Sequence, residues 1–588
     1  MCGVFGYVGQ SIDVGDTILT ALKTLEYRGY DSWGLALSTP DDLLVHKGVG
    51  RINGRVRSYP SSTQGIGHTR WATHGGVEPA NSHPHLDCFR RIAVVHNGII
   101  ENHVELRAQL LARGHRLQSE TDSDVVAHLV EEELASGSDL ASAVATVFGL
   151  LEGYNAVVVM DRLEQRFAAA KRVSPLVLGR SPRASTVASD AIALNDHADE
   201  LIYLEDDQLA VLCADGVSIF ERSSMRQISP VVISHSDRIE GVDLGRYPDF
   251  LSKEVAEQPA ALRRLVREGQ EEIEKLAEAI AAAANVVVTG CGTAGNAALA
   301  GTYLLDQICG RAMTMIPASE FRYRSRTLDS GSLVIAMSQS GETVDVLDAM
   351  SVAVERAAKL AAIVNTPMST LDRLVDTRVL LRAGVEQCVL ATKSYTTMLA
   401  TLLMAAHAVD DRWSTGADLV LRAADAIESM LENGSRKRIQ EVATRLAAAE
   451  HLFVIGRGPH YPSALEAALK IKEVSYIHAE GFAAGELKHG VIALVEGGTP
   501  CVVLAPDDAT RTDVLSGAAE LRSRGGHIIG VGSTGNGVFD DFIQIPEAGS
   551  ASLIVEAIPG QLLGYFAAIA RGNDPDRPRN LAKSVTVK

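Results

Sequence analysis

The chain has 588 residues, of which 46% are hydrophobic and 22% are charged, and its formal net charge at pH 7 is −18. This length exceeds what one hydrophobic core supports and predicts about three or four domains, in a composition typical of globular proteins. The acidic balance excludes a general nucleic-acid or membrane-surface binder, so anionic substrates must be held by local groups against the overall field.

The cysteine pattern and the lengths of the apolar runs indicate the cellular compartment of the protein. Seven cysteines are scattered without Cys-x-x-Cys pairs, which fits a reducing environment and predicts neither a disulfide framework nor a zinc site. The chain does not open with a signal-like segment, and we expect no apolar run of transmembrane length. These features predict a cytoplasmic protein that binds neither nucleic acid nor membranes.

A cysteine follows the initial methionine. Removal of Met1 would make Cys2 the N-terminal residue, with a thiol and a free α-amino group on one residue. An α-amine with an ordinary pKa of about 7.7–8.0 can take the thiol proton near neutral pH, which makes the thiolate a nucleophile. The alternative is an ordinary buried cysteine that acts as a small hydrophobic residue.

Up to about residue 240, short apolar runs typical of strands alternate with helical patterns. We expect helices over residues 14–26 and 122–134. The expected strands include residues 4–8, 92–95, 156–160 and 209–212. Together they predict a layered sheet domain over residues 1–240.

Three polar motifs in this region suit the parts of a glutamine molecule. Arg70, in the string 68–75, offers a fork of donors to a carboxylate, and Asp122 offers a negative charge to an ammonium group. Asn97 and Gly98 offer an amide and a backbone N–H to an oxyanion. A packed loop, a helix cap and an Asn-Gly turn are the alternatives.

The same motifs, in this order, resemble the N-terminal-nucleophile glutamine amidotransferase domain, whose layers run α/β/β/α. The matching strings are residues 1–3, 26–32, 68–75, 96–98 and 119–122. The resemblance implies that Cys2 is the nucleophile, that Asn97 and Gly98 form the oxyanion hole, and that Trp71 gates an ammonia channel. The glutamine-binding residues that it implies are Arg70, Trp71, Thr73, His74 and Asp122. The chain departs from the family at Trp33, where alanine is usual, and at Val173, where glycine is usual.

Beyond residue 240 the character of the chain changes. Buried strands alternate with alanine-rich helices, which predicts doubly wound parallel sheets. A strand followed by Gly-x-Gly and a helix occurs at residues 285–292 and again at 451–458, so we expect two related units. The predicted segments are a linker at 241–275, a first unit at 276–415, a connecting helix at 416–440, a second unit at 441–575 and a tail at 576–588.

Two glycine- or hydroxyl-rich turns in the first of these units suit phosphate groups. Residues 338–343 place hydroxyls and backbone N–H groups at a helix N-terminus, where one phosphate can bind without a lysine. A simple Ser/Thr cap is the alternative. Gly290, Gly292 and Gly295 match the dinucleotide fingerprint literally, and that alternative predicts NAD binding.

The second unit contains groups able to move protons. Glu466, Lys470 and Glu473 are spaced to share one face of a helix, and His489 stands beside Gly490, where it can titrate near pH 7. Such groups could transfer protons between adjacent sugar carbons. A solvated charged face is the alternative for the helical stripe.

This half resembles tandem sugar isomerase domains, and the whole chain resembles the glutamine–fructose-6-phosphate aminotransferase, or glucosamine-6-phosphate synthase, family. The supporting strings include residues 318–324, 338–343, 472–480 and 578–587. The resemblance implies that His489 opens the sugar ring, that Lys583 forms a Schiff base with the ketone, and that Glu473, with Lys470 nearby, moves a proton between C1 and C2. The sugar-phosphate-binding residues that it implies are Thr293, Ser338, Gln339, Ser340, Thr343 and Val389. It implies a homodimer and no metal or redox cofactor.

Departures from the family cluster near the sugar and leave the acceptor open. Ala294 and Ala391 replace residues that bear hydroxyls in the family, and Cys388 replaces a glycine. One alternative is therefore a paralogue that aminates a different keto-sugar phosphate.

Two further alternatives are other classes of function. An amidotransferase that forms asparagine should show an adenylating motif, and one that forms phosphoribosylamine should show a phosphoribosyl-diphosphate motif; we find neither. A sugar-phosphate sensor without catalysis is the remaining alternative.

Overall fold

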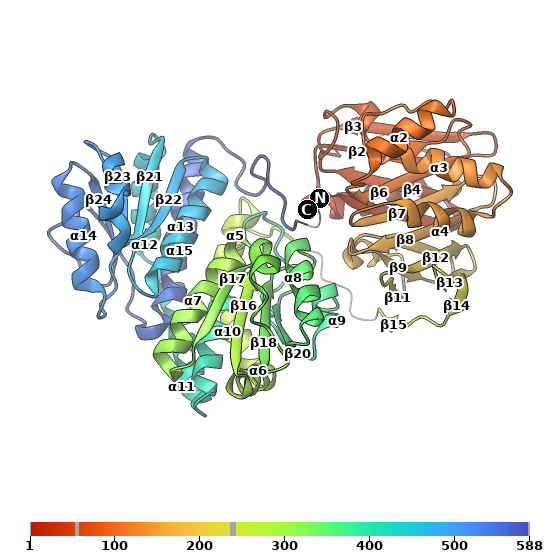
Figure 1. Ribbon diagram of the computed structural model, residues 1–588. Helices are drawn as coiled ribbons and strands as arrows, with labels where there is room; N and C mark the ends of the chain where they lie inside the picture. Colours follow the sequence, from red (N-terminus) through yellow and green to blue (C-terminus); the bar gives the residue numbers. More distant parts are fainter. Residues whose placement is uncertain (1, 53–57, 236–242, 586–588) are drawn as a thin grey trace. The chain divides into compact units, whose positions relative to one another are not determined.

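The structure, a computed structural model, describes residues 2–52, 58–235 and 243–585 (Figure 1). The chain forms two compact units, one of Met1–Gly241 with Ser584–Lys588 and the other of Val242–Lys583. The first unit contains two antiparallel sheets, and the second contains two parallel sheets.

The first unit stacks an eight-stranded sheet on a seven-stranded sheet. In spatial order the larger sheet consists of β15 (Ile233–Ser234), β11 (Glu200–Tyr203), β9 (Val177–Arg180), β10 (Ala184–Ala188), β1 (Gly3–Ile12), β4 (Ser62–Arg70), β2 (Ser32–Ser38) and β3 (Leu43–Val49). The smaller sheet consists of β14 (Arg226–Ile228), β13 (Gly216–Glu221), β12 (Gln208–Cys213), β8 (Arg166–Arg172), β7 (Asn155–Asp161), β6 (Ile92–Gly98) and β5 (His85–Leu86). The helices of this unit are α1 (Val14–Thr24), η1 (Glu26–Arg28), η2 (Pro79–Asn81), α2 (His103–Ala112), α3 (Asp124–Ala135), α4 (Leu140–Leu150) and η3 (Ala191–Leu194).

Side chains alternate between the two faces of each strand, and this alternation builds the layers of the first unit. In β1, Val4 and Val8 belong to the core between the sheets, whereas Phe5 and Tyr7 pack with α1 on the outer face of the larger sheet. The helices α2, α3 and α4 pack on the outer face of the smaller sheet. The predicted α/β/β/α order is thus confirmed, because a side-chain period of two gives each strand two buried faces.

The second unit contains two five-stranded parallel sheets, as predicted for doubly wound folds. Their spatial orders are β17 (Met313–Pro317), β16 (Asn285–Gly290), β18 (Ser332–Ser338), β19 (Lys359–Val364) and β20 (Thr377–Leu380), and β22 (His478–Ala483), β21 (His451–Gly456), β23 (Pro500–Leu504), β24 (His527–Gly532) and β25 (Asp541–Gln544). The longer helices are α5 (Phe250–Glu268), α6 (Gln270–Ala282), α7 (Gly292–Cys309), α8 (Val344–Glu355), α10 (Lys393–Ala408), α11 (Trp413–Glu432), α12 (Gly434–Leu446), α13 (His460–Ser475), α14 (Arg511–Ser523) and α15 (Ser552–Ala570). The short ones are η4 (Ala318–Arg324), α9 (Thr370–Leu374), η5 (Ala484–His489), η6 (Val491–Leu494) and η7 (Gly549–Ala551).

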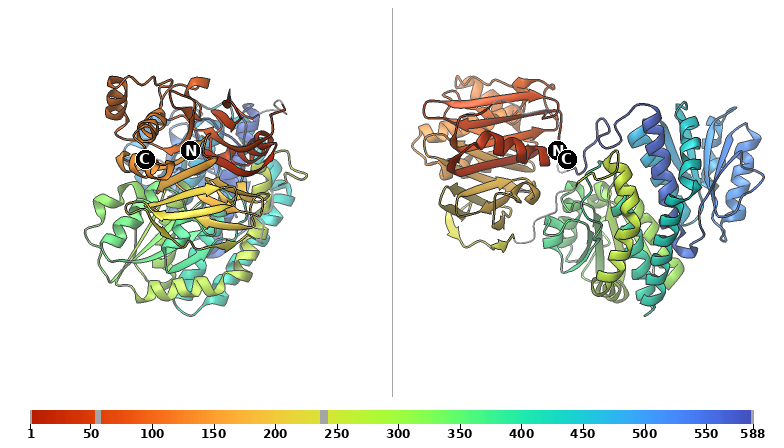
Figure 2. Two further views of the ribbon diagram at one scale, coloured as in Figure 1. Left: turned by 90° about the vertical axis from the view of Figure 1, so that its right-hand side faces the viewer. Right: turned by 180° about the vertical axis from the view of Figure 1, so that it is seen from behind.

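One continuous core joins the two parallel sheets. It extends from Leu251 to Ala568 and includes inward residues of both sheets. Figures 1 and 2 show α7 and α13 between the sheets, and these helices pack against each other. The two isomerase-like halves therefore share one apolar interior.

The segment predicted as a linker, residues 241–275, includes α5 and part of α6. Leu251, Val255 and Leu262 of α5 are fully buried in the shared core. Their spacing forms an apolar stripe along one side of the helix, which packs against α10 and α11. Residues 250–282 are therefore an integral part of the second unit.

One helical segment among the described residues, 549–570, is long and apolar enough to cross a membrane, with a mean hydropathy of 1.6. The expectation that no apolar run reaches this length is wrong for this segment. However, 89% of its most apolar 18-residue window is buried inside the protein, where α15 packs against α12 and α13. Its composition matches that of a helix at the centre of a core, which is apolar on all sides.

His460 begins α13 and is buried between two carboxylates. Its Nδ1 lies 2.8 Å from Glu556 Oε2 on α15, and its Nε2 lies 2.9 Å from Asp508 Oδ2. Burial lowers the pKa of this imidazole, but the two carboxylates outweigh burial and raise it to about 10. A protonated His460 thus ties α13 to α15 and to the loop after β23.

We expect His460→Gln to lower the melting temperature more at about pH 6 than at about pH 10. The unfolded histidine has a pKa of about 6.5, so the stabilisation is complete below that pH and is lost as pH rises through about 10. Circular dichroism during heating at both pH values measures the effect, and His478→Gln, at an exposed histidine, is the matched control. Equal losses at the two pH values would contradict this account.

Candidate functional site

Cys2 lies immediately before β1, beside the segment that follows β4. Its Sγ accepts a hydrogen bond from the Trp71 N–H at 3.3 Å. Burial raises the pKa of the thiol, while the Trp71 N–H and the charge of Arg70 act in the opposite direction. The thiol is therefore held in a polar contact at the end of two neighbouring strands.

Asn97 lies next to Cys2 in a fixed orientation. Its Nδ2 donates to the Cys2 carbonyl oxygen at 3.0 Å, and its Oδ1 lies 3.1 Å from His68 Nε2. The same Nε2 lies 3.0 Å from the His96 carbonyl oxygen, and two acceptors require a proton on this nitrogen. Burial lowers the pKa of His68 to about 3, so the imidazole is neutral and orients the Asn97 amide.

Gly98 occupies a position that only glycine fits. Its φ is +133°, and a Cβ atom there would lie 2.1 Å from the Tyr154 carbonyl oxygen. Asn97 and Gly98 pair with Ala156 and Asn155 of β7. The Asn-Gly string therefore ends a strand, and the alternative of a simple turn does not apply.

Asp122 is buried beside the same strand end. Its Oδ2 accepts a hydrogen bond from the Ile100 N–H at 2.8 Å, and the Ser123 hydroxyl donates to its Oδ1 at 3.3 Å. Ser123 occupies the N-cap position of α3. Asp122 thus does not cap the helix, and its carboxylate lies close to the Asn97–Gly98 segment.

Arg70 ends β4 and holds the loop that follows it. Its guanidinium donates to the carbonyl oxygens of Gly76 at 3.0 Å and of Gly75 at 3.2 Å, and also to that of His74. Thr73 in this loop is exposed. The loop that contains the predicted glutamine-binding residues is therefore organised by one of them.

Two aromatic contacts flank this loop. Trp71 makes an edge contact with Tyr30, with ring centroids 5.9 Å apart. His74 packs against His103, with ring centroids 4.9 Å apart. All residues predicted for glutamine chemistry therefore lie within the first unit, around the start of β1 and the ends of β4 and β6.

In the second unit, the hydroxyl-rich turn lies where predicted, between β18 and α8. Ser338 ends the strand, and its Oγ lies 3.3 Å from Thr343 Oγ1 and accepts from the Gly341 N–H at 3.0 Å. Gly341 has φ +70°, and a Cβ atom there would lie 2.0 Å from Ser369 Oγ. Thr343 occupies the N-cap position, but its side chain makes no capping hydrogen bond. Simple capping therefore does not explain this threonine.

The backbone of Gln339 and the side chain of Ser340 stabilise the same turn. The Gln339 carbonyl oxygen accepts from the Asn365 N–H at 3.2 Å, and Ser340 Oγ accepts from the Glu342 N–H at 3.1 Å. The turn is thereby tied to the end of β19. Ser338, Gln339, Ser340 and Thr343 are brought together, as their closeness in sequence requires.

The helical stripe on α13 is buried at Glu466 and Lys470 and only partly exposed at Glu473, so it is no solvated face. Lys470 Nζ lies 2.7 Å from Glu473 Oε2 and 3.4 Å from Glu466 Oε1. Burial lowers the pKa of Lys470, but the two carboxylates outweigh it, so the pKa lies above its ordinary value. Lys470 is 1% exposed and remains charged between its partners.

Glu466 also joins the two halves of the second unit. It accepts hydrogen bonds from Thr293 Oγ1 at 3.0 Å and from Asn296 Nδ2 at 2.8 Å, both on α7. The hydroxyl of Thr293, predicted to bind phosphate, therefore contacts α13. This contact places the start of α7 next to the charged stripe.

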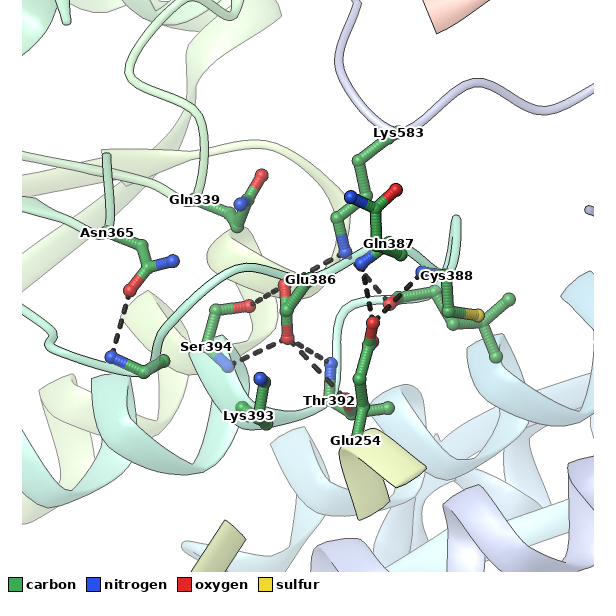
Figure 3. Close-up of polar contacts among 12 residues, drawn as sticks. Glu254, Gln339, Asn365, Glu386, Gln387, Cys388, Thr392, Lys393, Ser394 and Lys583 are labelled. Atoms are coloured by element: carbon green, nitrogen blue, oxygen red, sulfur yellow. Dashed lines mark hydrogen bonds and ion pairs between the residues drawn. The ribbon is translucent and has the colours of Figure 1, made fainter. Parts of the chain in front are cut away.

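Lys583 is buried in an ion pair that the sequence does not reveal (Figure 3). Its Nζ donates to Glu386 Oε2 at 2.8 Å and to the Leu390 carbonyl oxygen at 3.0 Å. Glu386 also accepts from the backbone N–H groups of Thr392 and Ser394 and from the Ser394 hydroxyl. Burial raises the pKa of Glu386, but Lys583 and these donors outweigh it and lower the pKa to about 2.

A second buried carboxylate supports the same loop. Glu254 on α5 accepts from the backbone N–H groups of Gln387 and Cys388, the latter at 3.0 Å. Burial raises its pKa to about 8. The Val389 N–H donates to the Asp576 carbonyl oxygen at 3.0 Å. The loop that contains Val389 is thus attached both to α5 and to the C-terminal tail.

His489 lies apart from the other predicted groups of the sugar site. It ends η5, whose Ala484 and Leu487 belong to a small core shared with α14. That core covers one face of the second parallel sheet, whereas α13 packs on the opposite face. The His489 side chain is exposed. The structure therefore does not bring His489 to Lys470 and Glu473.

The departures from the family pattern differ in their structural effects. Trp33 packs against Gly48, where a Cβ atom would lie 2.7 Å from the indole ring. Val173 has φ +66°, a conformation that glycine adopts more easily than a β-branched residue. Ala294 is buried in the first turn of α7. Nothing in the structure explains the choice of valine at position 173 or of alanine at 391.

The sequence does not single out Glu386, Glu254 or Asn296. Their importance comes from burial and from partners more than a hundred residues away. The sequence signals are positional only: Asn296 directly follows Gly295 of the glycine-rich turn, and Glu386 stands two residues before Cys388, where the chain departs from the family.

Two families of protein domain match the chain. The SIS domain matches residues 279–408 and 445–539, and the glutamine amidotransferase domain matches residues 68–196. Curated proteins align over the full length of both chains. They include the "glutamine–fructose-6-phosphate aminotransferase (isomerizing)" of Thermococcus kodakarensis, 39% identical over 605 residues, and that of Streptomyces coelicolor, 40% identical over 620 residues.

Solved structures resemble the second unit. The C-terminal domain of glucosamine-fructose-6-phosphate aminotransferase from Francisella tularensis has a TM-score of 0.54 and 31% identity, covering 57% of this chain and 100% of that chain. A structure titled glucosamine-6-phosphate deaminase from Thermotoga maritima has a TM-score of 0.50 and 25% identity, covering 58% and 100%. These similarities agree with the paired parallel sheets.

We expect Glu386→Gln to destabilise the second unit by about 3–5 kcal/mol, because it leaves the buried Lys583 ammonium without a charged partner. The double variant Glu386→Gln with Lys583→Met should recover most of this loss. Differential scanning calorimetry of the full chain measures both. Glu257→Gln is the matched control, because Glu257 pairs with Lys393 but its side chain is 36% exposed. A loss for Glu386→Gln no larger than that of the control would contradict the importance of this pair.

Proposed function

Because the chain belongs to the glutamine–fructose-6-phosphate aminotransferase (isomerizing) family, we propose that it converts fructose 6-phosphate and glutamine into glucosamine 6-phosphate and glutamate. The observation that supports this most is the cluster around Cys2 in the first unit, where Asn97 contacts the Cys2 backbone and Asp122 lies beside the same strand end. The second unit contributes buried Lys583 and the charged stripe of α13.

Glutamine hydrolysis starts at Cys2. After Met1 is removed, the α-amine takes the thiol proton, and Sγ attacks the side-chain amide carbon of glutamine. The oxyanion accepts hydrogen bonds from Asn97 Nδ2 and the Gly98 N–H. Collapse of this intermediate releases ammonia and leaves a thioester, which water hydrolyses to glutamate. The contact of Asn97 with the Cys2 backbone, and its orientation by His68, support these roles.

The remaining groups of the first unit bind the glutamine backbone. Arg70 pairs with the α-carboxylate and Asp122 with the α-ammonium. Trp71, Thr73 and His74 complete the glutamine site, and Trp71 gates the internal passage of ammonia. The burial of Asp122 beside Ile100, close to the oxyanion donors, supports its assignment.

The hydroxyl-rich turn binds the sugar phosphate. Ser338, Gln339, Ser340 and Thr343 surround the phosphate at the N-terminus of α8, whose dipole favours an anion. Thr293 and Val389 complete this side of the site. Local binding of this kind is needed because the net charge of the chain repels a phosphate. The absence of a capping hydrogen bond from Thr343 supports the assignment.

Sugar chemistry takes place at Lys583 and Glu473. His489 opens the ring, and the Lys583 amine attacks the C2 ketone to form a Schiff base once its proton has been removed. Schiff-base formation releases the ketone oxygen as water, and ammonia then attacks the C=N carbon C2 and releases the Lys583 amine. Glu473 afterwards moves a proton from C1 to C2, which turns the C2 imine into an amine and C1 into the aldehyde carbon, while Lys470 holds the Glu473 carboxylate in place. Glu386 is a positioning residue, because its ion pair keeps Nζ at this place.

We also propose that the protein is a cytoplasmic homodimer. All seven cysteines are free thiols, which fits a reducing compartment. His489 is exposed, on the opposite face of the sheet from α13. A second copy of the chain can supply His489 to the sugar site, which one chain by itself does not do.

Mixing two inactive variants tests the dimer. Lys583→Ala and His489→Ala should each form little glucosamine 6-phosphate, and subunit exchange between them should restore activity, since one site of each mixed dimer keeps both groups. A mixture of Lys583→Ala with Lys583→Arg is the control. If the first mixture stays as inactive as its components, although sedimentation shows mixed dimers, the proposal is wrong.

Product analysis tests the reaction itself. With glutamine labelled with ¹⁵N in its amide, we expect labelled glucosamine 6-phosphate by mass spectrometry, and fructose 6-phosphate should be preferred within a panel of ketose phosphates. Cys2→Ala should lose at least about a thousandfold in glutamine hydrolysis. Labelled product from another ketose phosphate alone would instead favour a paralogue, and Ala391→Ser would then be expected to alter the preference.

A further inference from the structure

Four side chains with metal-binding atoms meet on the surface of the first unit, away from the groups assigned to glutamine. They come from three separate elements. Cys88 lies in the turn between β5 and β6, His115 follows α2, and His128 and Glu131 lie one turn apart on α3. One ligand atom of each lies within 4.8 Å of the others. The chain thus offers one sulfur, two imidazole nitrogens and one carboxylate oxygen at one point.

The separations of these atoms fit a tetrahedron. Cys88 Sγ lies 3.7 Å from His115 Nδ1 and 3.5 Å from His128 Nδ1. Glu131 Oε2 lies 3.5 Å from His115 Nδ1 and 3.3 Å from His128 Nδ1. Ordinary zinc–ligand lengths with tetrahedral angles require about 3.5 Å between sulfur and nitrogen and about 3.3 Å between nitrogen and oxygen. These four separations are therefore close to those that a bound zinc ion imposes, and the other two, from sulfur to oxygen and from nitrogen to nitrogen, lie within 4.8 Å.

Groups around the cluster orient its ligands. His115 Nε2 lies 3.1 Å from Glu132 Oε1, so the nitrogen opposite the candidate ligand atom faces a carboxylate, as is usual for zinc-bound histidines. Glu131 Oε2 also accepts from the Cys88 N–H at 2.9 Å. On the other side of the fully buried His128, Nε2 lies 3.9 Å from Asp124 Oδ1. The hydrogen bond with Glu132 orients the His115 ring, and the Asp124 carboxylate faces the far nitrogen of the buried His128 ring.

The cluster is open to a metal ion from solvent. Cys88 is partly exposed. A cavity of about 390 Å³ is lined by His115, Glu131 and Glu132 together with Asp87, Arg91 and neighbouring apolar residues. Its polar wall thus includes two of the candidate ligands and the carboxylate that orients one of them, and the Arg91 guanidinium is paired with Asp161. An ion can therefore reach the site without unfolding the domain.

We propose that Cys88, His115, His128 and Glu131 bind a Zn²⁺ ion. A thiolate with two imidazoles favours zinc over the hard cations magnesium and calcium, and four protein ligands are typical of a structural site. Binding displaces the thiol proton of Cys88 to solvent and forms the Zn–S bond, with no change of oxidation state. The ion ties the β5–β6 turn and the α2–α3 connection to α3, which begins two residues after Asp122.

Metal binding by the full-length protein tests this site. The chain is made in a Cys2→Ala background, since an N-terminal cysteine can chelate zinc by itself, and is stripped with a chelator. We expect one Zn²⁺ per chain by mass spectrometry of metals, an increase in melting temperature on adding Zn²⁺, and, with Co²⁺ as the probe, the visible bands of a tetrahedral site and a thiolate charge-transfer band.

Matched variants distinguish this site from adventitious binding. Cys88→Ser should lose the thiolate band and the thermal shift, whereas Cys213→Ser, at another partly exposed cysteine of the same unit, should keep both. Glu132→Gln should weaken Zn²⁺ binding by about 10–100-fold. Loss of both signals in Cys88→Ser with retention in Cys213→Ser supports the site. Less than stoichiometric zinc, or equal binding by wild type and Cys88→Ser, overturns it, and neither result depends on the sugar or glutamine chemistry.

Discussion

The buried ion pair between Glu386 and Lys583 is the interaction on which the proposed sugar site of the second unit depends. Two charges removed from water cost several kcal/mol unless their remaining hydrogen-bonding capacity is satisfied. Here Thr392 and Ser394 satisfy the carboxylate, and the Leu390 carbonyl oxygen accepts from the ammonium. The pair thereby fixes a tail lysine against a loop 197 residues earlier in the chain. Without it, the amine proposed to react with the ketone would have no defined position.

The two units solve the problem of burying polar groups in different ways. In the first, the neutral imidazole of His68 orients the neutral Asn97 amide beside Cys2. In the second, charges are buried in sets, such as Lys470 between Glu466 and Glu473. The difference suits the proposed chemistry, because an oxyanion hole is built from fixed dipoles, whereas proton transfer uses acid and base groups held close together.

One shared core determines how the second unit is assembled. Because α7 and α13 pack within it, Thr293 and Asn296 from one half reach Glu466 in the other. The same sheet that supports α13 places η5 on its opposite face, so that two neighbouring segments of the sequence are separated. Closeness in the chain is therefore a poor guide to which groups can react together.

The sequence by itself determined the fold class of both units and the family, since strand and helix periods are local properties and each proposed reacting group lies in a short string with its own chemistry. It did not determine that residues 250–282 belong to the second core, or that the apolar segment 549–570 is a central helix. Only the tertiary structure decided the partner of Lys583 and brought Cys88 next to His115 and His128. Burial and contacts between distant segments decide such partners, and neither leaves a periodic mark in the sequence.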